Sequence, residues 1–141
     1  MEPGTARARI VSDTEERFVA LRRELGVSSF GMNQIVLQPG QRGRIHRHEH
    51  QEEVYLVLEG TLTLLVEDEP RELRHGDLAR VAPDVRRQLV NRHPEPLLLL
   101  AAGGAKPHEG RDGRAYRSWD EQGEGSAPAD VPFPESVPVD G

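Results

Sequence analysis

The chain has 141 residues, a formal net charge of −6 and no cysteine. A chain of this length forms one small domain that can bury a real hydrophobic core. Without cysteine, disulfides and thiolate metal sites are excluded, so any bound metal must be held by nitrogen and oxygen atoms. The negative charge argues against a general nucleic-acid-binding protein.

Neither a membrane span nor a signal peptide is visible in the sequence. The longest apolar run, Pro96 to Ala102, is far shorter than the roughly 18 to 20 residues that a spanning helix needs. The amino terminus lacks the apolar core of a signal peptide. We therefore expect a cytoplasmic protein with no membrane partner.

Residues 1–27 are expected to form an N-terminal extension. Its one helical candidate is the segment 18–25, in which Phe18, Leu21 and Leu25 share a helical face. Gly26 follows as a residue that could cap the helix. A strand is the alternative for this segment.

Residues 28–103 alternate short apolar runs with turn residues at regular intervals, a pattern typical of antiparallel β structure. Eight strands are expected, and no helices alternate with them. Such a set predicts a closed sandwich or barrel, because closure removes exposed strand edges. The expected strands are 30–37, 44–48, 53–58, 61–67, 71–74, 78–82, 87–91 and 97–102.

Residues 104–141 are expected to form an irregular tail. Residues 118–141 hold six acidic residues and no basic one, and they are rich in proline and glycine. This composition does not pack a core of its own. The aromatic residues Tyr116, Trp119 and Phe133 predict anchors that dock the tail on the domain, with a lid over a pocket as the alternative.

The residues that suggest chemistry lie between positions 40 and 60. Side chains alternate faces along a strand, so His46 and His48 point the same way, and Glu53 arrives from the next strand after a turn. Two imidazoles and one carboxylate form a facial triad suited to Fe(II), with Mn, Ni, Co and Zn as competitors. We therefore predict that His46, His48 and Glu53 bind one divalent transition metal.

Two neighbours of this triad leave alternatives open. His50 has the same parity as the two histidines and could supply a third imidazole, although it lies where the chain should turn. Glu52 stands beside Glu53, and only one of these two side chains can face inward. Tyr55 and His50 are the candidates for proton donation beside the metal.

The spacing of the triad resembles the first sequence motif of the cupin superfamily, in its single-domain, conserved-barrel form. Gly40, His46, His48, Glu53 and Gly60 match the fixed positions of that motif. The resemblance implies an all-β fold, a double-stranded β-helix or jelly-roll barrel, with a short N-terminal extension and an irregular C-terminal tail. It also implies a homodimer, since cupins commonly pair through outer strands.

The segment 76–91 is similar to the second cupin motif, with Gly76, Asp77, Pro83 and Asn91 in place. Two positions depart from it. Asp84 stands where a turn glycine is common, and Arg87 stands where the family has its third histidine ligand.

Arg87 is the difficulty for a metal site, because a guanidinium stays protonated and cannot donate a lone pair. At about 4 Å and an effective dielectric constant of 20, each unit of like charge costs roughly 4 kcal/mol. Three outcomes stay open: Arg87 turns away and leaves a three-ligand site, it pairs with Glu53 or with an anionic substrate, or the pocket holds no metal. Arg87, Arg44 and Asn91 are the candidate substrate-binding residues.

On such a barrel, the residues that share the face of the two histidines are Glu53, Tyr55 and Val57, and those expected on the facing wall are Arg87, Leu89 and Asn91. The opposite faces are also aliphatic. A sheet that is apolar on both faces needs cover, which again favours a homodimer. The residues expected on these opposite faces include Leu56, Leu58, Leu62 and Leu64.

Two functions follow from the sequence. The first is a metal-binding cupin that acts on a small polar, anionic molecule, with dioxygenase or isomerase chemistry, since the family includes both. The second is a non-catalytic module, without metal, that binds a small anion or sugar. The fold does not choose between them.

Overall fold

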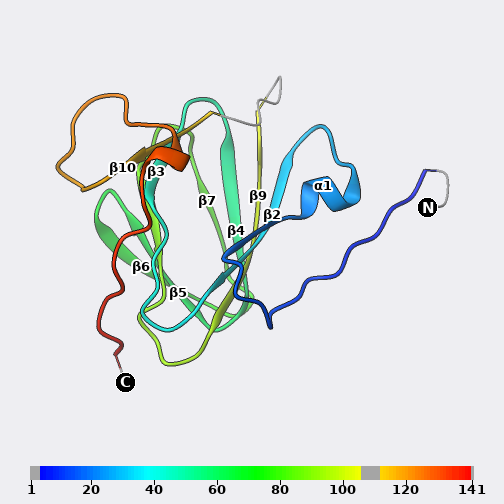
Figure 1. Ribbon diagram of the computed structural model, residues 1–141, viewed down its shortest axis with the longest axis horizontal. Helices are drawn as coiled ribbons and strands as arrows, with labels where there is room; N and C mark the ends of the chain where they lie inside the picture. Colours follow the sequence, from blue (N-terminus) through cyan, green and yellow to red (C-terminus); the bar gives the residue numbers. More distant parts are fainter. Residues whose placement is uncertain (1–3, 106–111, 141) are drawn as a thin grey trace.

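The computed structural model describes residues 4–105 and 112–140. Two five-stranded antiparallel sheets face each other, and Figure 1 shows them as two layers. One sheet has the order β1-β2-β9-β4-β7 and the other the order β10-β3-β8-β5-β6. The strands are β1 (Phe18–Ala20), β2 (Gly31–Leu37), β3 (Ile45–His48), β4 (Glu52–Glu59), β5 (Thr61–Val66), β6 (Glu69–Arg74), β7 (Leu78–Val81), β8 (Arg87–Val90), β9 (Leu97–Gly104) and β10 (Gly113–Tyr116).

This architecture confirms the all-β jelly-roll barrel expected from the sequence. Each of the eight strands expected between residues 28 and 103 is present, as β2 to β9. The two helical elements are α1 (Leu21–Leu25) and the 3-10 helix η1 (Pro128–Asp130). Within residues 4–105 and 112–140, no helix is long and apolar enough to cross a membrane.

The core lies between the two sheets. Tyr55, Val57 and Leu89 belong to it, as the alternation along β4 and β8 predicted. Leu62 and Leu64 were expected on an outer face, but they are also in the core. The reason is that the chain changes sheets at Gly60, after a register shift between Val57 and Glu59, so the parity of β4 does not continue into β5.

The N-terminal extension is partly built into the barrel. β1 pairs with β2 and forms the edge of its sheet, and α1 follows β1 directly. Gly26 ends α1 in the left-handed conformation with φ of 71°, as expected for a helix cap. The segment 18–25 therefore combines the two alternatives, a short strand and then a single helical turn.

The C-terminal segment departs from the expectation of an irregular tail in one respect. β10 pairs antiparallel with β3, so that Gly113 lies opposite His48 and Ala115 opposite His46. The predicted boundary after residue 103 therefore leaves β10 outside the barrel, whereas in the structure β10 is an edge strand of one of the two sheets. Its sequence, Gly-Arg-Ala-Tyr, lacks the apolar run of strands such as β5 and β9, so the sequence alone did not indicate a strand here.

The rest of the tail docks on the outside of the barrel. The Phe133 ring stacks on Phe18, with ring centroids 5.9 Å apart, and two guanidinium groups, from Arg17 and Arg44, lie over its faces. Tyr116 is buried. Both residues are anchors, as predicted. No residue of the described tail lines the cavity beside the histidines, so the structure gives no support for the alternative of a lid.

Candidate metal centre

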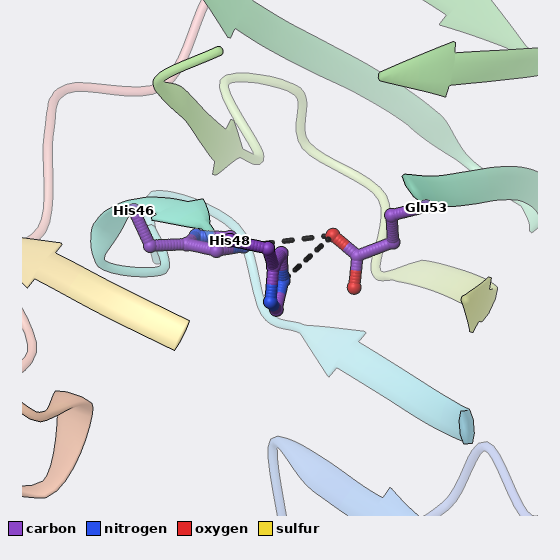
Figure 2. Close-up of side chains that lie close together, drawn as sticks. All are labelled: His46, His48 and Glu53. Atoms are coloured by element: carbon purple, nitrogen blue, oxygen red, sulfur yellow. Dashed lines mark ion pairs between the residues drawn. The ribbon is translucent and has the colours of Figure 1, made fainter. Parts of the chain in front are cut away.

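β3 and β4 bring the three predicted ligands together. His46 and His48 point from β3 to the same side, with edge-to-face rings whose centroids are 5.3 Å apart. Glu53 points toward them from β4, and its Oε1 lies 3.6 Å from His46 Nε2 and 3.5 Å from His48 Nε2 (Figure 2). The sequence prediction of this triad, and of Glu53 over Glu52, therefore agrees with the geometry.

Glycine gives Glu53 room to take this position. Gly103 lies opposite Glu53 in the pairing of β4 with β9. A Cβ atom at Gly103 would lie 2.7 Å from the backbone oxygen of Glu52 and 3.5 Å from Cγ of Glu53. A side chain at position 103 would therefore push β4 and its carboxylate away from the histidines.

The donor atoms of the triad fit one metal ion. One nitrogen or oxygen atom from each residue lies within 4.8 Å of the others. Ligands held at about 2.0–2.2 Å from one transition metal lie about 3 Å apart, so only small side-chain adjustments are needed. His48 Nε2 is buried and has no hydrogen-bond partner among the described residues. A buried polar atom of this kind calls for a ligand.

The charges of the triad depend on one another. Burial alone would raise the pKa of Glu53, but its close interactions with His46 and His48 outweigh burial and hold this pKa well below its usual range. Burial alone would lower the pKa of His48, but the partners Glu53 and Asp112 raise it. The carboxylate is therefore ionised, and protons compete with a metal for the imidazoles.

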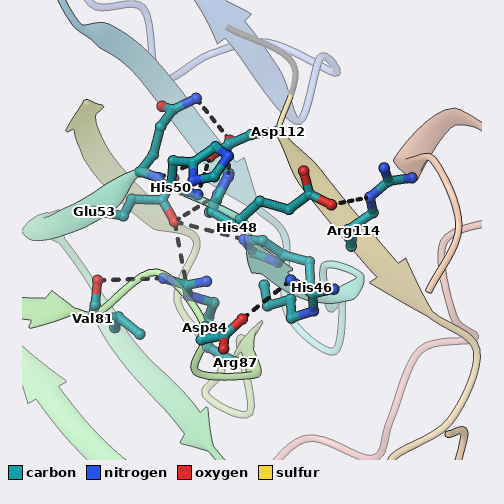
Figure 3. Close-up of polar contacts among 12 residues, drawn as sticks. His46, His48, His50, Glu53, Val81, Asp84, Arg87, Asp112 and Arg114 are labelled. Carbon is teal, nitrogen blue, oxygen red and sulfur yellow. Dashed lines mark hydrogen bonds and ion pairs between the residues drawn. The ribbon is translucent and has the colours of Figure 1, made fainter. Parts of the chain in front are cut away.

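Asp112 is a functional residue that sequence reasoning missed. Its Oδ1 accepts a hydrogen bond from His48 Nδ1 at 2.9 Å, and its Oδ2 accepts from the backbone nitrogens of His50 and Gln51 (Figure 3). Burial raises the pKa of Asp112, but these hydrogen bonds lower it further than burial raises it. With the proton fixed on Nδ1, the lone pair of Nε2 faces the metal position.

His46 is oriented by a different partner. Its Nδ1 lies 3.1 Å from the backbone oxygen of Arg44, to which it can donate only in the tautomer that leaves Nε2 free. The two imidazoles therefore both turn Nε2 toward Glu53. One is held by a carboxylate and the other by a carbonyl group, so His48 is the more electron-rich ligand.

Arg87 is fully buried, and it stays beside the triad instead of turning away. Its Nε lies 3.9 Å from Glu53 Oε1, and Nη2 donates to the backbone oxygens of Val81 and Ala82 (Figure 3). Nε and Nη1 have no hydrogen-bond partner among the described residues. Of the three outcomes left open by the sequence, the structure shows the pair of Arg87 with Glu53.

Tyr55 lies below the triad in the core. Its hydroxyl donates a short hydrogen bond to Oε1 of Glu53. Burial and the neighbouring charge of Glu53 raise the pKa of Tyr55 well above its usual value, so the phenol keeps its proton. The same carboxylate oxygen therefore faces a phenol, a guanidinium and two imidazoles.

Three predicted residues are not brought into the site. His50 lies in the turn before β4 with an exposed side chain, and it does not belong to the group of donor atoms. Arg44 turns to the tail, where Nε donates to the backbone oxygen of Val131. Asn91 uses its amide to donate to the carbonyls of Leu37 and Glu95, so the structure gives it a structural role in place of substrate contact.

A cavity of about 210 Å³ opens beside the triad. We call it the mouth cavity. The sequence did not predict its arginine residues, because they come from α1, outside the two motifs. It is lined by Ala20, Arg22, Arg23, Gly31, Met32, Asn33, His48, Gln51, Glu53 and Gly103.

Comparisons with known proteins agree with this fold. Three solved structures share 22 to 26% identity with the chain. A cupin protein from Bacteroides fragilis is 22% identical with a TM-score of 0.67, over 87% of this chain and 99% of that one. A sugar phosphate isomerase of the cupin superfamily from Silicibacter pomeroyi is 24% identical with a TM-score of 0.63, over 84% and 82%.

A third structure, from Acidithiobacillus ferrooxidans, has a name that includes the words sugar phosphate isomerase. It is 26% identical with a TM-score of 0.56, and the match covers 61% of this chain and 56% of that one. The chain thus spans little more than half the length of this relative. No curated protein sequence matches the chain.

The pattern of the family described as Cupin domain matches residues 33–103, half of the chain. This match includes both motifs, all three ligands of the triad and Arg87. The chain belongs to the cupin superfamily.

Proposed function

We propose that the protein binds one divalent transition metal through His46, His48 and Glu53 and acts on a small anionic molecule by dioxygenase or isomerase chemistry. The observation that carries this proposal is that the donor atoms of these three residues lie close together. One of them, His48 Nε2, is buried and has no hydrogen-bond partner among the described residues. When bound, the metal would supply a Lewis acid and open positions for substrate or oxygen.

Other residues of the chain would orient the imidazoles, donate a proton and favour an anionic substrate. Asp112 and the Arg44 carbonyl hold the imidazoles in the tautomer that binds metal. Tyr55 keeps a proton on its phenolic oxygen next to Glu53, and this makes it the candidate proton donor of the site. Arg87 holds a positive charge 3.9 Å from Glu53 and favours an anionic substrate.

The names of two similar structures support an isomerase among these candidates. Both names include the words sugar phosphate isomerase, and the structure from Acidithiobacillus ferrooxidans is 26% identical to this chain. A sugar phosphate is small, polar and anionic, as the charge of the site requires. Its isomerisation would use a proton donor or acceptor beside a Lewis acid.

Elemental analysis tests the metal. Protein purified without chelator should carry close to one transition metal ion per chain, and the double variant His46→Ala/His48→Ala should carry none. His93→Ala is the matched control, because His93 pairs with Glu72 on the surface, away from the triad. The proposal would be contradicted if wild-type protein takes up no metal and its melting temperature does not change when a chelator is added.

A second function is favoured by the burial of Arg87. If its guanidinium excludes metal, the barrel is a binding module for a small anion or sugar. Arg87→His, which restores the family's third histidine, separates the two functions. In a metal centre it raises metal affinity, because it removes a like charge that costs roughly 4 kcal/mol at 4 Å. In a metal-free module, Arg87→His gains a metal that wild type lacks, and anion binding in chelator disappears.

We also propose a cytoplasmic homodimer. The outer face of β4 carries Val54, Leu56 and Leu58, all half-buried, and Leu78 of the neighbouring strand β7 is 66% exposed. A second copy of the chain would cover this apolar surface. Sedimentation should give the mass of a dimer for wild type and of a monomer for Leu56→Glu. A wild-type monomer at micromolar concentration would contradict the dimer.

A further inference from the structure

The mouth cavity has two chemically different sides. One side carries His48 and Glu53 of the triad, and the other carries Arg22 and Arg23 of α1. α1 packs beside β2, at the edge of the sheet (Figure 1). A ligand in this cavity would touch the metal ligands at one end and a pair of guanidinium groups at the other.

Arg22 differs from Arg23 in its surroundings. Arg23 is exposed, whereas Arg22 is only partly exposed and its Nε is buried with no hydrogen-bond partner among the described residues. No ion pair to a described carboxylate is formed by either residue. A buried guanidinium nitrogen without a partner is costly, and an anion in the cavity would supply that partner.

The charges around the cavity favour an anion once a metal is bound. The charged side chains that line the cavity beside His48 are two guanidinium groups, from Arg22 and Arg23, and one carboxylate, from Glu53. A bound dication would add two more positive charges. Positive charge in a half-buried site attracts anions more strongly than the same charge in water does.

We propose that the mouth cavity binds a small ligand bearing a phosphate or carboxylate group, and that Arg22 is the residue that binds this group. The proposal rests on the proposed function, because the other end of the ligand would reach the metal ligands His48 and Glu53. The planar guanidinium of Arg22 offers Nε and a terminal nitrogen to two oxygens of one anion. Arg23 contributes a screened charge at the entrance.

The size of the cavity limits the ligand. Its volume of about 210 Å³ is below the roughly 300 to 1,000 Å³ of pockets that hold drug-sized molecules. Gln51 cannot reorganise freely to widen it, since its Nε2 donates to Asp112 at 2.8 Å. The fitting class is a small metabolite with an anionic head, whereas a nucleotide would not fit.

Calorimetric titration of Mn²⁺-loaded protein with inorganic phosphate, and separately with succinate, tests this site. Arg22→Gln should weaken the binding of the recognised probe by about tenfold or more, as expected for a hydrogen bond between charged groups. Arg22→Lys, which keeps the charge but loses the planar fork, should lie between wild type and Arg22→Gln. The probe that is more sensitive to Arg22 identifies the anionic group.

Arg23→Gln is the matched control, because it removes the same charge from the same helix at an exposed position. It should weaken binding by less than about threefold, as expected for a screened surface charge. Equal losses for Arg22→Gln and Arg23→Gln, or no loss for Arg22→Gln with either probe, would overturn the proposal. Equal melting temperatures of the variants would show that α1 is intact.

Metal content separates this proposal from the proposed function. Arg22→Gln should carry the same amount of Mn²⁺ as wild type, because no ion pair joins Arg22 to the triad among the described residues. Wild-type protein without metal would contradict the proposed function alone, and the difference between Arg22→Gln and Arg23→Gln would still decide the role of Arg22. Metal-loaded protein without that difference would contradict the role of Arg22 alone.

Discussion

The inner wall of the pocket and its mouth are built from different parts of the chain. The inner wall holds Tyr55 and Arg87, which are fully buried and come from β4 and β8, inside the segment that matches the cupin family. Arg22, which lines the mouth cavity, and Asp112, which is buried behind His48, come instead from α1 and from the residue before β10, outside that segment. The barrel therefore provides the three candidate metal ligands, and the flanking segments add Arg22 and Asp112 beside them.

This division separates two kinds of sensitivity. Buried charges in the inner wall contribute to the stability of the fold, because removing one partner leaves the other charge buried and unpaired. Arg22 is only partly buried, and Asp112, although buried, lies outside the apolar core, so we expect both to be changed with less damage to the core. We expect inner-wall variants to affect stability and metal together, and mouth variants to affect mainly metal or ligand.

The largest effect is expected for Glu53→Gln in the inner wall. The change removes a metal ligand and the one carboxylate that pairs with Arg87 among the described residues. Breaking a buried pair leaves an uncompensated charge, so we expect metal binding to be lost and the free energy of unfolding to fall by about 3 kcal/mol. Urea unfolding in chelator measures the second effect.

Glu52→Gln is the control for this variant. Glu52 is the adjacent residue, but it is exposed and pairs with Arg80 on the surface. We expect it to change the free energy of unfolding by less than about 1 kcal/mol and to keep full metal content. Equal losses for both variants would show that Glu53 is not the inward-facing carboxylate.

A smaller effect is expected for Asp112→Ala, behind His48. Metal affinity should fall about 10- to 100-fold, because the partner that fixes the His48 tautomer is lost. Asp84→Ala, which removes an exposed acid that pairs with Arg47, should leave the affinity unchanged. An Asp112→Ala variant that unfolds more easily but binds metal as tightly as wild type would show that Asp112 only holds the turn before β4.

The smallest effect is expected in the dependence of stability on pH, which should have opposite signs with and without metal. The pKa of His48 is raised in the metal-free protein. Its contribution to the free energy of unfolding is therefore complete below about pH 6.5 and is lost as the pH rises through the raised pKa. Metal requires neutral imidazole, so metal-loaded protein should gain stability over the same rise. Each slope is at most about 1.4 kcal/mol per pH unit for one proton.

Melting temperatures between pH 6 and 8, with chelator and with Mn²⁺, check these signs. His48→Gln should flatten the slope in chelator, because it removes the titrating group. If melting temperature changes with pH in the same way with and without metal, the ion does not bind through His48. The difference expected between inner-wall and mouth variants would then not be explained by metal binding.

The sequence predicted the inner wall better than the mouth. His46, His48 and Glu53 are close in the chain, and strand alternation alone places them on one face. Tyr55 and Arg87 follow from the same alternation and from the second motif. Leu62 and Leu64 were misplaced because alternation holds only within a strand, and the chain changes sheets at Gly60.

The mouth could not be predicted in the same way. Asp112 is 64 residues from the histidine that it orients, and nothing in the local sequence links the two. Arg22 lies in a helix of five residues that follows β1, and the sequence left a strand and a helix open for this segment without placing it beside β2. Both residues act through contacts that are local in space and distant in sequence.

The pairing of β10 with β3 also has a consequence for how the protein folds. Pairs such as His48 with Gly113 close a long loop, and the entropy of closure makes such contacts slow to form. The hydrogen bond from His48 to Asp112 cannot form before β10 has docked. During refolding, we therefore expect full metal affinity only after β10 has paired with β3, so that metal uptake would report this long-range pairing.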